Sequence, residues 1–245
     1  MNELHLFAGA GGGILGGMLL GHTCVCAVEI EQYPRKVLLQ RQRDGILPRF
    51  PIWDDICTFD GKPWRGRVDV VCGGFPCQDI SAAGKGAGIE GERSGLWGEM
   101  ARIIGEVRPS YVFVENSPLL VGRGLARVLG DLAKMGFDAT WGIVGADAAG
   151  LPHHRARLWL VADANGIQRG KSQRGQGALR LPFRVEPPAV GEWIPEPAIL
   201  GENHGVAAIV DRCKAIGNGQ VPAVAALAWG LLNQEDRIVR DLRKR

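Results

Sequence analysis

The feature that most constrains the fold is a short apolar run that leads into a glycine-rich turn and then into a helical stretch. Residues 3–7 have the character of a strand, residues 8–13 are Ala-Gly-Ala-Gly-Gly-Gly, and residues 14–20 are mostly apolar. Glycine reaches backbone conformations closed to other residues, so this order predicts a strand, a tight turn and a helix. Such a unit is the building block of an α/β sheet.

The same alternation continues as far as residue 164. Further strands are expected at residues 24–29, 68–72, 111–115, 139–144 and 157–161, and helices at residues 32–43, 96–107, 121–135 and 221–232. The run at 68–72 is apolar without interruption, which is typical of a parallel strand buried on both faces. We therefore predict an α/β fold with a doubly wound, mostly parallel sheet.

The pattern is interrupted between residues 163 and 207. Residues 165–185 are rich in glycine, glutamine and serine and carry basic but no acidic side chains, and residues 186–197 are rich in proline. Neither segment has the composition of a sheet core. We predict one domain built from residues 1–162 and 208–245, with a small insertion at 163–207.

Composition excludes several classes of protein. Apolar residues make up 46% and charged residues 22% of the 245 residues, which is typical of a globular chain. No apolar run reaches the roughly 18 residues that a membrane span needs, and the N-terminus lacks the order of a signal peptide. We expect a cytoplasmic monomer, and the net charge of +3 permits a polyanionic partner.

The cysteines and histidines do not predict a metal centre. No Cys-x-x-Cys pair occurs, and Cys24 and Cys26 lie in a predicted strand. His153 and His154 have no cysteine at ligand spacing. We expect no metal ligands and interpret most cysteines as small buried side chains.

Polar residues follow the ends of several predicted strands. The first turn could cradle a nucleotide-like ligand, with Glu29 at the end of the next strand accepting hydrogen bonds from ribose hydroxyls. The turn could equally be structural. Its glycines do not form the Gly-x-Gly-x-x-Gly pattern, which argues against NAD.

Two further strand ends carry reactive groups. Cys77 follows the strand at 68–72 within Gly73-Gly74-Phe75-Pro76-Cys77-Gln78, where open α/β sheets bind ligands. A cysteine there can be a nucleophile, although alone a structural thiol is the simpler interpretation. Glu115 ends the next strand, and it could face the same pocket or cap the following helix.

Arg155 and Arg157 stand just before and at the start of an apolar strand. Alternate strand positions share a face, so both guanidinium groups could hold a planar acceptor such as a base carbonyl. A solvated basic edge is the alternative.

Taken together and in this order, five segments resemble the DNA cytosine-5 methyltransferase family. They are Leu6-Phe7-Ala8-Gly9, Gly74-Phe75-Pro76-Cys77-Gln78, Glu115-Asn116, Arg155-x-Arg157 and Gly217-Asn218-Gly219-x-x-Pro222. The resemblance covers residues 1–162 and 210–232. It implies the Rossmann-like fold of methyltransferases that use S-adenosyl-L-methionine, with the insertion as a small target-recognition region.

The resemblance also implies a mechanism on a cytosine flipped out of double-stranded DNA. Cys77 would add to carbon 6 of the base and make carbon 5 nucleophilic toward the methyl group of S-adenosylmethionine. Glu115 would hydrogen-bond or protonate ring nitrogen 3, Arg157 would contact the base oxygen, and Arg155 would support Arg157.

Binding residues are implied in the same way. The cofactor would be held by Phe7, Gly9, Gly11, Gly12, Glu29, Ile30, Asp55, Ile56, Pro76, Leu96 and Asn218. DNA would be contacted by Gln78, Ser81, Lys85, Arg93, Arg169, Lys171, Arg174, Arg180 and Arg184. The glycines between residues 84 and 95 resemble the family's loop that closes over DNA, although a plain surface connection has the same composition.

The chain departs from the commonest family pattern at His5, Ser117 and His153, and its insertion is shorter than usual. We interpret the short insertion as reading a short or degenerate site, mostly through backbone contacts, with a disordered basic linker as the alternative. Three other functions stay open: a tRNA cytosine-5 methyltransferase, a catalytically silent DNA-binding relative and, least supported, an NAD enzyme. The Cys-Phe-Thr tripeptide of the tRNA enzymes is absent.

Overall fold

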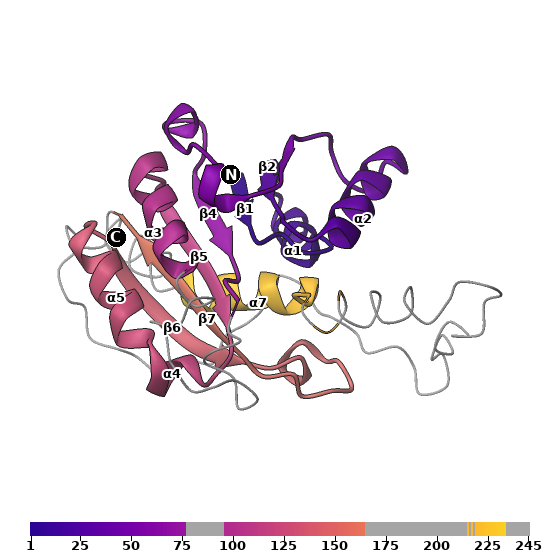
Figure 1. The fold of residues 1–245 in the computed structure, drawn as a ribbon. Coiled ribbons are helices and arrows are strands. Elements are labelled where there is room, and N and C mark those ends of the chain that lie inside the picture. Colours follow the sequence, from indigo (N-terminus) through magenta and orange to yellow (C-terminus); the bar gives the residue numbers. More distant parts are fainter. Residues whose placement is uncertain (77–95, 165–214, 216, 218, 234–245) are drawn as a thin grey trace, which may run out of the picture.

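The computed structural model describes residues 1–76, 96–164, 215, 217 and 219–233, and these form a sheet covered by helices (Figure 1). The strands are β1 (Asn2–Leu6), β2 (Thr23–Val28), β3 (Ile52–Trp53), β4 (Val70–Gly73), β5 (Tyr111–Asn116), β6 (Asp138–Val144) and β7 (Arg157–Asp163). The α-helices are α1 (Gly12–Leu19), α2 (Gln32–Arg43), α3 (Leu96–Val107), α4 (Leu120–Arg123), α5 (Leu125–Lys134) and α7 (Pro222–Asn233). Short 3-10 turns are η1 (Ile56–Thr58), η2 (Lys62–Trp64) and η4 (Asp147–Ala149).

The strands form one seven-stranded sheet in the order β3-β2-β1-β4-β5-β7-β6. Strands β1 to β5 pair in parallel, which confirms the mostly parallel, doubly wound sheet. The chain winds outward from β1 in both directions, so the order reverses between β1 and β4. Open α/β sheets bind their ligands at this reversal, beyond the carboxyl ends of the strands.

The last two strands differ from the rest because β7 pairs antiparallel with both β5 and β6. A parallel connection needs a crossover, which is usually a helix. Between β6 and β7 the chain forms only the short turn η4, so the two strands return as a hairpin. The hairpin brings the start of β7 next to the end of β5.

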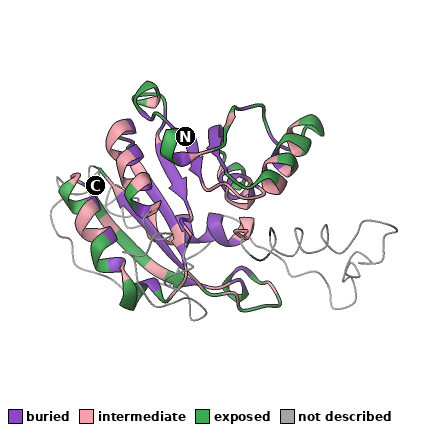
Figure 2. Cartoon of the chain, viewed as in Figure 1, coloured by how far each residue is buried: buried purple, intermediate pink, exposed green. Residues whose placement is uncertain are grey.

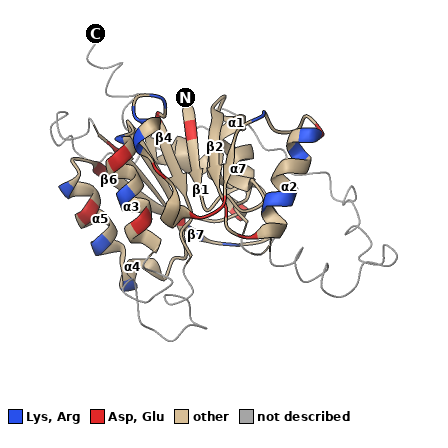
Figure 3. Cartoon of the chain, turned by 45° about the horizontal axis from the view of Figure 1, so that its top comes forward, with Lys and Arg blue, Asp and Glu red and all other residues tan. Residues whose placement is uncertain are grey.

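Apolar side chains fill both faces of the sheet, and most of the sheet is buried (Figure 2). On one face, Leu4, Val71 and Val112 pack with side chains of α3 and α5. On the other face, Val70 and Phe113 pack against α7, while side chains of β2 pack with α1 and α2. Lys, Arg, Asp and Glu are concentrated on α2, α3 and α5 among the helices, and most of the sheet carries neither charge (Figure 3).

Several boundaries differ from the sequence prediction, and three of them have a clear position in the chain. The predicted strand at 3–7 ends at Leu6 because Phe7 has a φ of 54° and already belongs to the turn. The strand predicted at 68–72 begins only at Val70. The single helix predicted at 121–135 is two helices, because Gly124 ends α4 and begins α5.

The cysteines follow the prediction in part. Cys24, Cys26 and Cys72 are buried, whereas Cys57 is exposed. Within the described residues, no helix combines the length and the apolar character that crossing a membrane requires.

Helix α1 packs so closely on the start of α7 that glycine is required. A Cβ atom on Gly12 would collide with the backbone carbonyl of Gln220, whereas one on Gly130 in α5 would have nothing within 4 Å. We expect Gly12→Ala to lower the free energy of unfolding by about 1–3 kcal/mol through overpacking. Gly130→Ala is the control and should raise it by roughly 0.5–1 kcal/mol. Urea denaturation of both variants checks this, and equal effects would contradict the close approach.

Candidate active site

The glycine-rich turn lies at the carboxyl edge of the sheet, next to the reversal of strand order. Gly9 and Gly11 have φ values of 54° and 90°, in the left-handed region that glycine adopts without a steric cost. Phe7 shares this backbone conformation at φ 54°, which costs energy in a residue with a side chain. A Cβ on Gly9 would have nothing within 4 Å, so open space lies over this part of the turn.

Glu29 follows β2 and is held by two backbone groups. Its Oε2 accepts a hydrogen bond from the Gly9 N–H at 2.7 Å, and its Oε1 accepts one from the Glu31 N–H at 2.8 Å. Burial raises the pKa of this carboxyl above its usual value, and the two backbone donors oppose that rise. The carboxylate is therefore fixed beside the turn, as the ribose-binding prediction requires.

The neighbouring strand end presents a second acid and apolar groups. Asp55 accepts a hydrogen bond from the Cys57 N–H through Oδ1 at 2.9 Å and so caps η1. Ile30 is 65% exposed, whereas Ile56 is buried. The edge of β1, β2 and β3 thus offers two positioned carboxylates and an exposed apolar side chain.

A second group of residues forms a pocket around Glu115, at the end of β5. Arg157, the first residue of β7, places its Nε 3.0 Å from the Glu115 Oε1 as an ion pair. The pocket is lined by Glu115, Arg155, Arg157, Trp159, Gln220 and Val221. The structure therefore brings Glu115 and both arginines together.

Burial dominates the electrostatics of this pocket. It raises the pKa of Glu115 above its usual value, although Arg157, Arg155 and a hydrogen bond from Gln220 favour the ionised form. Burial also lowers the pKa of Arg155, and the positive charge of Arg157 adds to this effect. A carboxyl group with a raised pKa keeps its proton to a higher pH than a free carboxyl group does.

The alternation of side chains along a strand does not explain why Arg155 reaches the pocket. It precedes β7 and has a φ of 21°, so it is not an alternate position of that strand. Its Nη2 donates hydrogen bonds to the carbonyl oxygens of Gly217 at 2.6 Å and Gly219 at 2.7 Å. Arg155 therefore ties the loop before α7 to the start of β7.

The segment that leads toward Cys77 runs beside Glu115. The Asn116 side-chain amide donates to the Phe75 carbonyl at 3.2 Å, and a Cβ on Gly74 would lie 2.8 Å from the Glu115 Oε2. Pro76 is half-buried, and Leu96 at the start of α3 packs against the main core. The chain segment just before Cys77, residues 74–76, thus lies against the pocket.

Several predicted site residues lie outside the described part of the chain. These are Cys77, Gln78, Ser81, Lys85, Arg93, Arg169, Lys171, Arg174, Arg180, Arg184 and Asn218. Their placement stays a prediction, as does the division of the chain into a domain and an insertion.

Sequence reasoning missed two residues of the pocket. Gln220 hydrogen-bonds Glu115, yet it occupies an unspecified position of Gly217-Asn218-Gly219-x-x-Pro222, where only its polar side chain could have drawn attention. Trp159 is buried, and its indole Nε1 has no hydrogen-bond partner within the described residues. In the sequence it was one residue of an apolar strand without a separate signal.

The sequence departures leave the pocket intact. Ser117 begins the turn into α4, where its N–H donates to the Asn116 Oδ1 at 2.8 Å. His153 is exposed in the loop between β6 and β7. His5 is buried on β1 and does not line this pocket; its Nε2 lies 2.8 Å from the Glu3 Oε2.

Sheet order, turn and strand-end acids together define a methyltransferase-type, Rossmann-like fold. The profile of the C-5 cytosine-specific DNA methylase family matches residues 1–182, and the chain belongs to this family. The chain is 33% identical to the type II methyltransferase M2.BsuMI of Bacillus subtilis over 66% of its own length and 42% of that protein. It is 34% identical to M.Eco47II of Escherichia coli over 68% and 40%.

The chain therefore spans about two fifths of the length of these relatives. Among solved structures, the Entamoeba histolytica methyltransferase EhMeth matches 77% of this chain and 57% of its own, with a TM-score of 0.59 and 16% identity. A DNMT2 mutant from Spodoptera frugiperda matches 76% and 57%, with a TM-score of 0.57 and 20% identity. These structures support the same fold.

Proposed function

We propose that this protein transfers a methyl group from S-adenosyl-L-methionine to carbon 5 of a cytosine in double-stranded DNA. The observation that carries the proposal is the pocket in which Glu115 pairs with Arg157, beside the segment that leads to Pro76-Cys77. A buried acid with a raised pKa and a neighbouring guanidinium match the groups that a cytosine presents on one edge.

The edge formed by β1 and β2 fits the cofactor. The open space over Gly9 would admit a ligand against the backbone, and the fixed Glu29 carboxylate would accept ribose hydroxyls. Asp55 would accept a hydrogen bond from the adenine amino group, with Ile30 and Ile56 as apolar contacts. When bound, S-adenosylmethionine supplies an electrophilic methyl group.

Residues in and near the pocket would have separate roles in methyl transfer. Cys77 would add as a thiolate to carbon 6 of the base, and the electron pair displaced toward carbon 5 would form the bond to the methyl group while the methyl–sulfur bond of the donor breaks and leaves a neutral thioether. Glu115 would donate a hydrogen bond or proton to ring nitrogen 3 and so stabilise the charge that develops there. Loss of the carbon-5 proton to solvent would then expel the Cys77 thiolate and restore the aromatic ring, and nitrogen 3 would return to Glu115 any proton that it received.

The two arginines would hold the base and the loop. Arg157 would contact the base oxygen while it orients Glu115. Arg155 would support it by holding Gly217 and Gly219, the sequence neighbours of Asn218, a proposed cofactor contact. These contacts require the base to leave the duplex, because the face of a stacked cytosine cannot be reached.

The proposed DNA contacts come from residues 77–95 and from the basic segment 165–185, both outside the described residues. Residues 77–95 would close over DNA, with Gln78, Ser81, Lys85 and Arg93 near the strand. The insertion at 163–207 would read a short or degenerate site within a catalytic domain made of 1–162 and 208–245.

Methylation mapping tests the proposal. Purified protein is incubated with tritiated S-adenosylmethionine and either duplex DNA or tRNA, and the product DNA is sequenced after bisulfite treatment. We expect transfer to DNA at cytosines in a motif of fewer than six bases. Transfer to tRNA alone would favour the RNA enzyme, whereas DNA binding with no transfer would favour a silent relative. Methylation confined to a longer motif would contradict the role assigned to the insertion.

Loosening the loop anchor should weaken cofactor binding. Arg155→Met keeps most of the length of the side chain but removes both hydrogen bonds that one guanidinium nitrogen donates to Gly217 and Gly219. Because hydrogen bonds to charged groups contribute about 1.5–3 kcal/mol, we expect the KM for S-adenosylmethionine to rise about 10-fold or more. Steady-state kinetics at saturating DNA measure this. An unchanged KM would show that the loop does not contribute to cofactor binding.

A further inference from the structure

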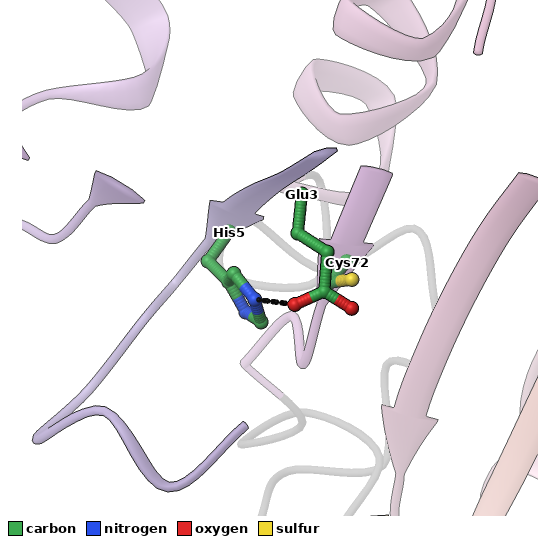
Figure 4. Close-up of side chains that lie close together, drawn as sticks. All are labelled: Glu3, His5 and Cys72. Atoms are coloured by element: carbon green, nitrogen blue, oxygen red, sulfur yellow. Dashed lines mark hydrogen bonds and ion pairs between the residues drawn. The ribbon is translucent and has the colours of Figure 1, made fainter. Parts of the chain in front are cut away.

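A buried cluster of three different metal-binding side chains lies on the face of the sheet toward α1 and α7. Glu3 and His5 of β1 and Cys72 of β4 point toward one another, and one ligand atom from each lies within 4.8 Å of the other two (Figure 4). The exposed fractions of the three residues are 3%, 5% and 4%. None of them takes part in the proposed methyl transfer.

Strand geometry explains why the three meet. Glu3 and His5 are two residues apart on β1 and so share a face. His5 stands directly opposite Cys72 in the parallel pairing of β1 with β4. The cluster is therefore built on the rigid centre of the sheet.

Space for an additional atom comes from glycines of α1. Gly13, Gly16 and Gly17 line, together with the cluster, a cavity of about 10 Å³. A Cβ on Gly17 would collide with the Glu3 carboxylate. A volume of this size holds about one water-sized sphere.

The carboxylate is oriented by a second histidine. His22, just before β2, places Nδ1 2.7 Å from the Glu3 Oε1, while the His5 Nε2 lies 2.8 Å from the Glu3 Oε2. His22 is itself packed edge-on against Trp229 of α7, with ring centroids 5.4 Å apart. Such an outer partner that holds a ligand carboxylate is common around metals in proteins.

The donor atoms of the cluster suit a cation. Each oxygen of the Glu3 carboxyl lies within hydrogen-bond distance of a histidine nitrogen, and the Cys72 thiol hydrogen-bonds the same carboxyl. No lysine or arginine lines the cavity within the described residues. A divalent cation in the cavity would therefore meet oxygen, nitrogen and sulfur donors.

We propose that Glu3, His5 and Cys72 bind one Zn²⁺ ion in a structural site that joins β1 to β4. A set of one oxygen, one nitrogen and one sulfur ligand favours zinc among the common divalent ions. Ligand bonds of about 2.0–2.3 Å place the donor atoms of a tetrahedral site about 3.3–3.8 Å apart. The Glu3–His5 contact must therefore open by about half an ångström, and the ion itself fills the cavity, which has room for about one water-sized sphere.

Binding exchanges protons for the metal. The Cys72 thiol releases its proton to solvent, and its sulfur bonds zinc as the thiolate. His5 would bind the metal through the lone pair of Nε2, with a proton on Nδ1. The His22 N–H keeps its hydrogen bond to the other oxygen of Glu3. One proton is released for each zinc bound.

The sequence gives no local indication of this site. Cys72 lies far along the chain from Glu3 and His5, and no short spacing motif connects them. The expectation of no metal ligands considered only Cys24-x-Cys26 and His153-His154. Parallel pairing of β1 with β4 creates the cluster.

Cobalt substitution tests the proposal with a readout that does not depend on methyl transfer. Chelator-treated protein is titrated with Co²⁺, and thiolate-to-cobalt charge transfer is followed by near-ultraviolet absorption. We expect one Co²⁺ per chain, displaced by Zn²⁺. Cys72→Ser should abolish the charge-transfer band, whereas the matched variant Cys26→Ser, a buried cysteine outside the cluster, should keep it.

Two further measurements make the result decisive. Zinc should raise the unfolding temperature of wild type and Cys26→Ser but not of Cys72→Ser, because an ion that binds only the folded chain stabilises it. Absence of the band in folded wild-type protein would overturn the proposal. Binding that survives Cys72→Ser and is lost in His153→Ala would also overturn it, because the metal would then sit on exposed histidines. Neither result bears on the proposed methyl transfer.

Discussion

Replacing Cys77 with serine is expected to lower the rate of methyl transfer by about 10⁴-fold or more, the scale seen when an enzyme loses its nucleophile. Serine has nearly the same shape, but its hydroxyl is far less acidic than a thiol and supplies almost no anion near neutral pH. Without addition at carbon 6, carbon 5 of the base stays a poor nucleophile. Single-turnover tritium transfer to duplex DNA measures the effect.

A covalent trap separates loss of chemistry from loss of binding. DNA that contains 5-fluorocytosine should form a stable adduct with wild type, because fluorine blocks the last elimination. Cys77→Ser should bind this DNA without forming the adduct, and Cys26→Ser should react like wild type. An adduct with Cys77→Ser, or more than a tenth of the wild-type rate, would show that another group is the nucleophile.

Glu115→Gln is expected to lower the rate of methyl transfer by about 10²–10⁴-fold, the usual contribution of a general acid. Glutamine keeps the size of the side chain and can still accept a hydrogen bond from Arg157, so the pocket should persist. It cannot transfer a proton to ring nitrogen 3. Single-turnover rates in saturating DNA report the loss, and a rate within threefold of wild type would remove Glu115 from the chemistry.

The same variant has a predicted effect on stability that depends on pH. Burial raises the pKa of Glu115 above its ordinary value of 4.5. The stability gained from the protonated carboxyl is therefore complete below about pH 4.5 and is lost as the pH rises through the higher folded value. Relative to wild type, Glu115→Gln should become more stable across that interval. Urea denaturation over a pH series measures this, and a constant difference would contradict the buried carboxyl.

The candidate site was partly predictable because its main residues stand at the ends of strands. Cys77, Glu115 and Glu29 each follow an apolar run, and parallel strands place such positions along one edge. Gln220 was not predictable in this way. Its contact with Glu115 depends on the packing of the start of α7 against the sheet, which no local pattern in the sequence reports.

For Arg155 and Arg157, too, the sequence predicts one part of the arrangement and the tertiary structure decides the other. The sequence alone places Arg157 at the start of an apolar strand. That this strand turns back antiparallel beside β5, and so pairs Arg157 with Glu115, follows from the short hairpin connection. The bonds from Arg155 to Gly217 and Gly219 join residues far apart in the chain.

The order of strands and helices, the glycine-rich turn and the reactive residues beyond the strand ends were determined by the sequence alone, because local periodicity and turn chemistry act over a few residues. The tertiary structure decided which distant residues meet: the antiparallel β6–β7 hairpin, the pairing of Glu115 with Arg157, and the cluster of Glu3, His5 and Cys72. Such contacts depend on strand register and on helices packing across the sheet. These are properties of the whole chain, and no segment of it encodes them by itself.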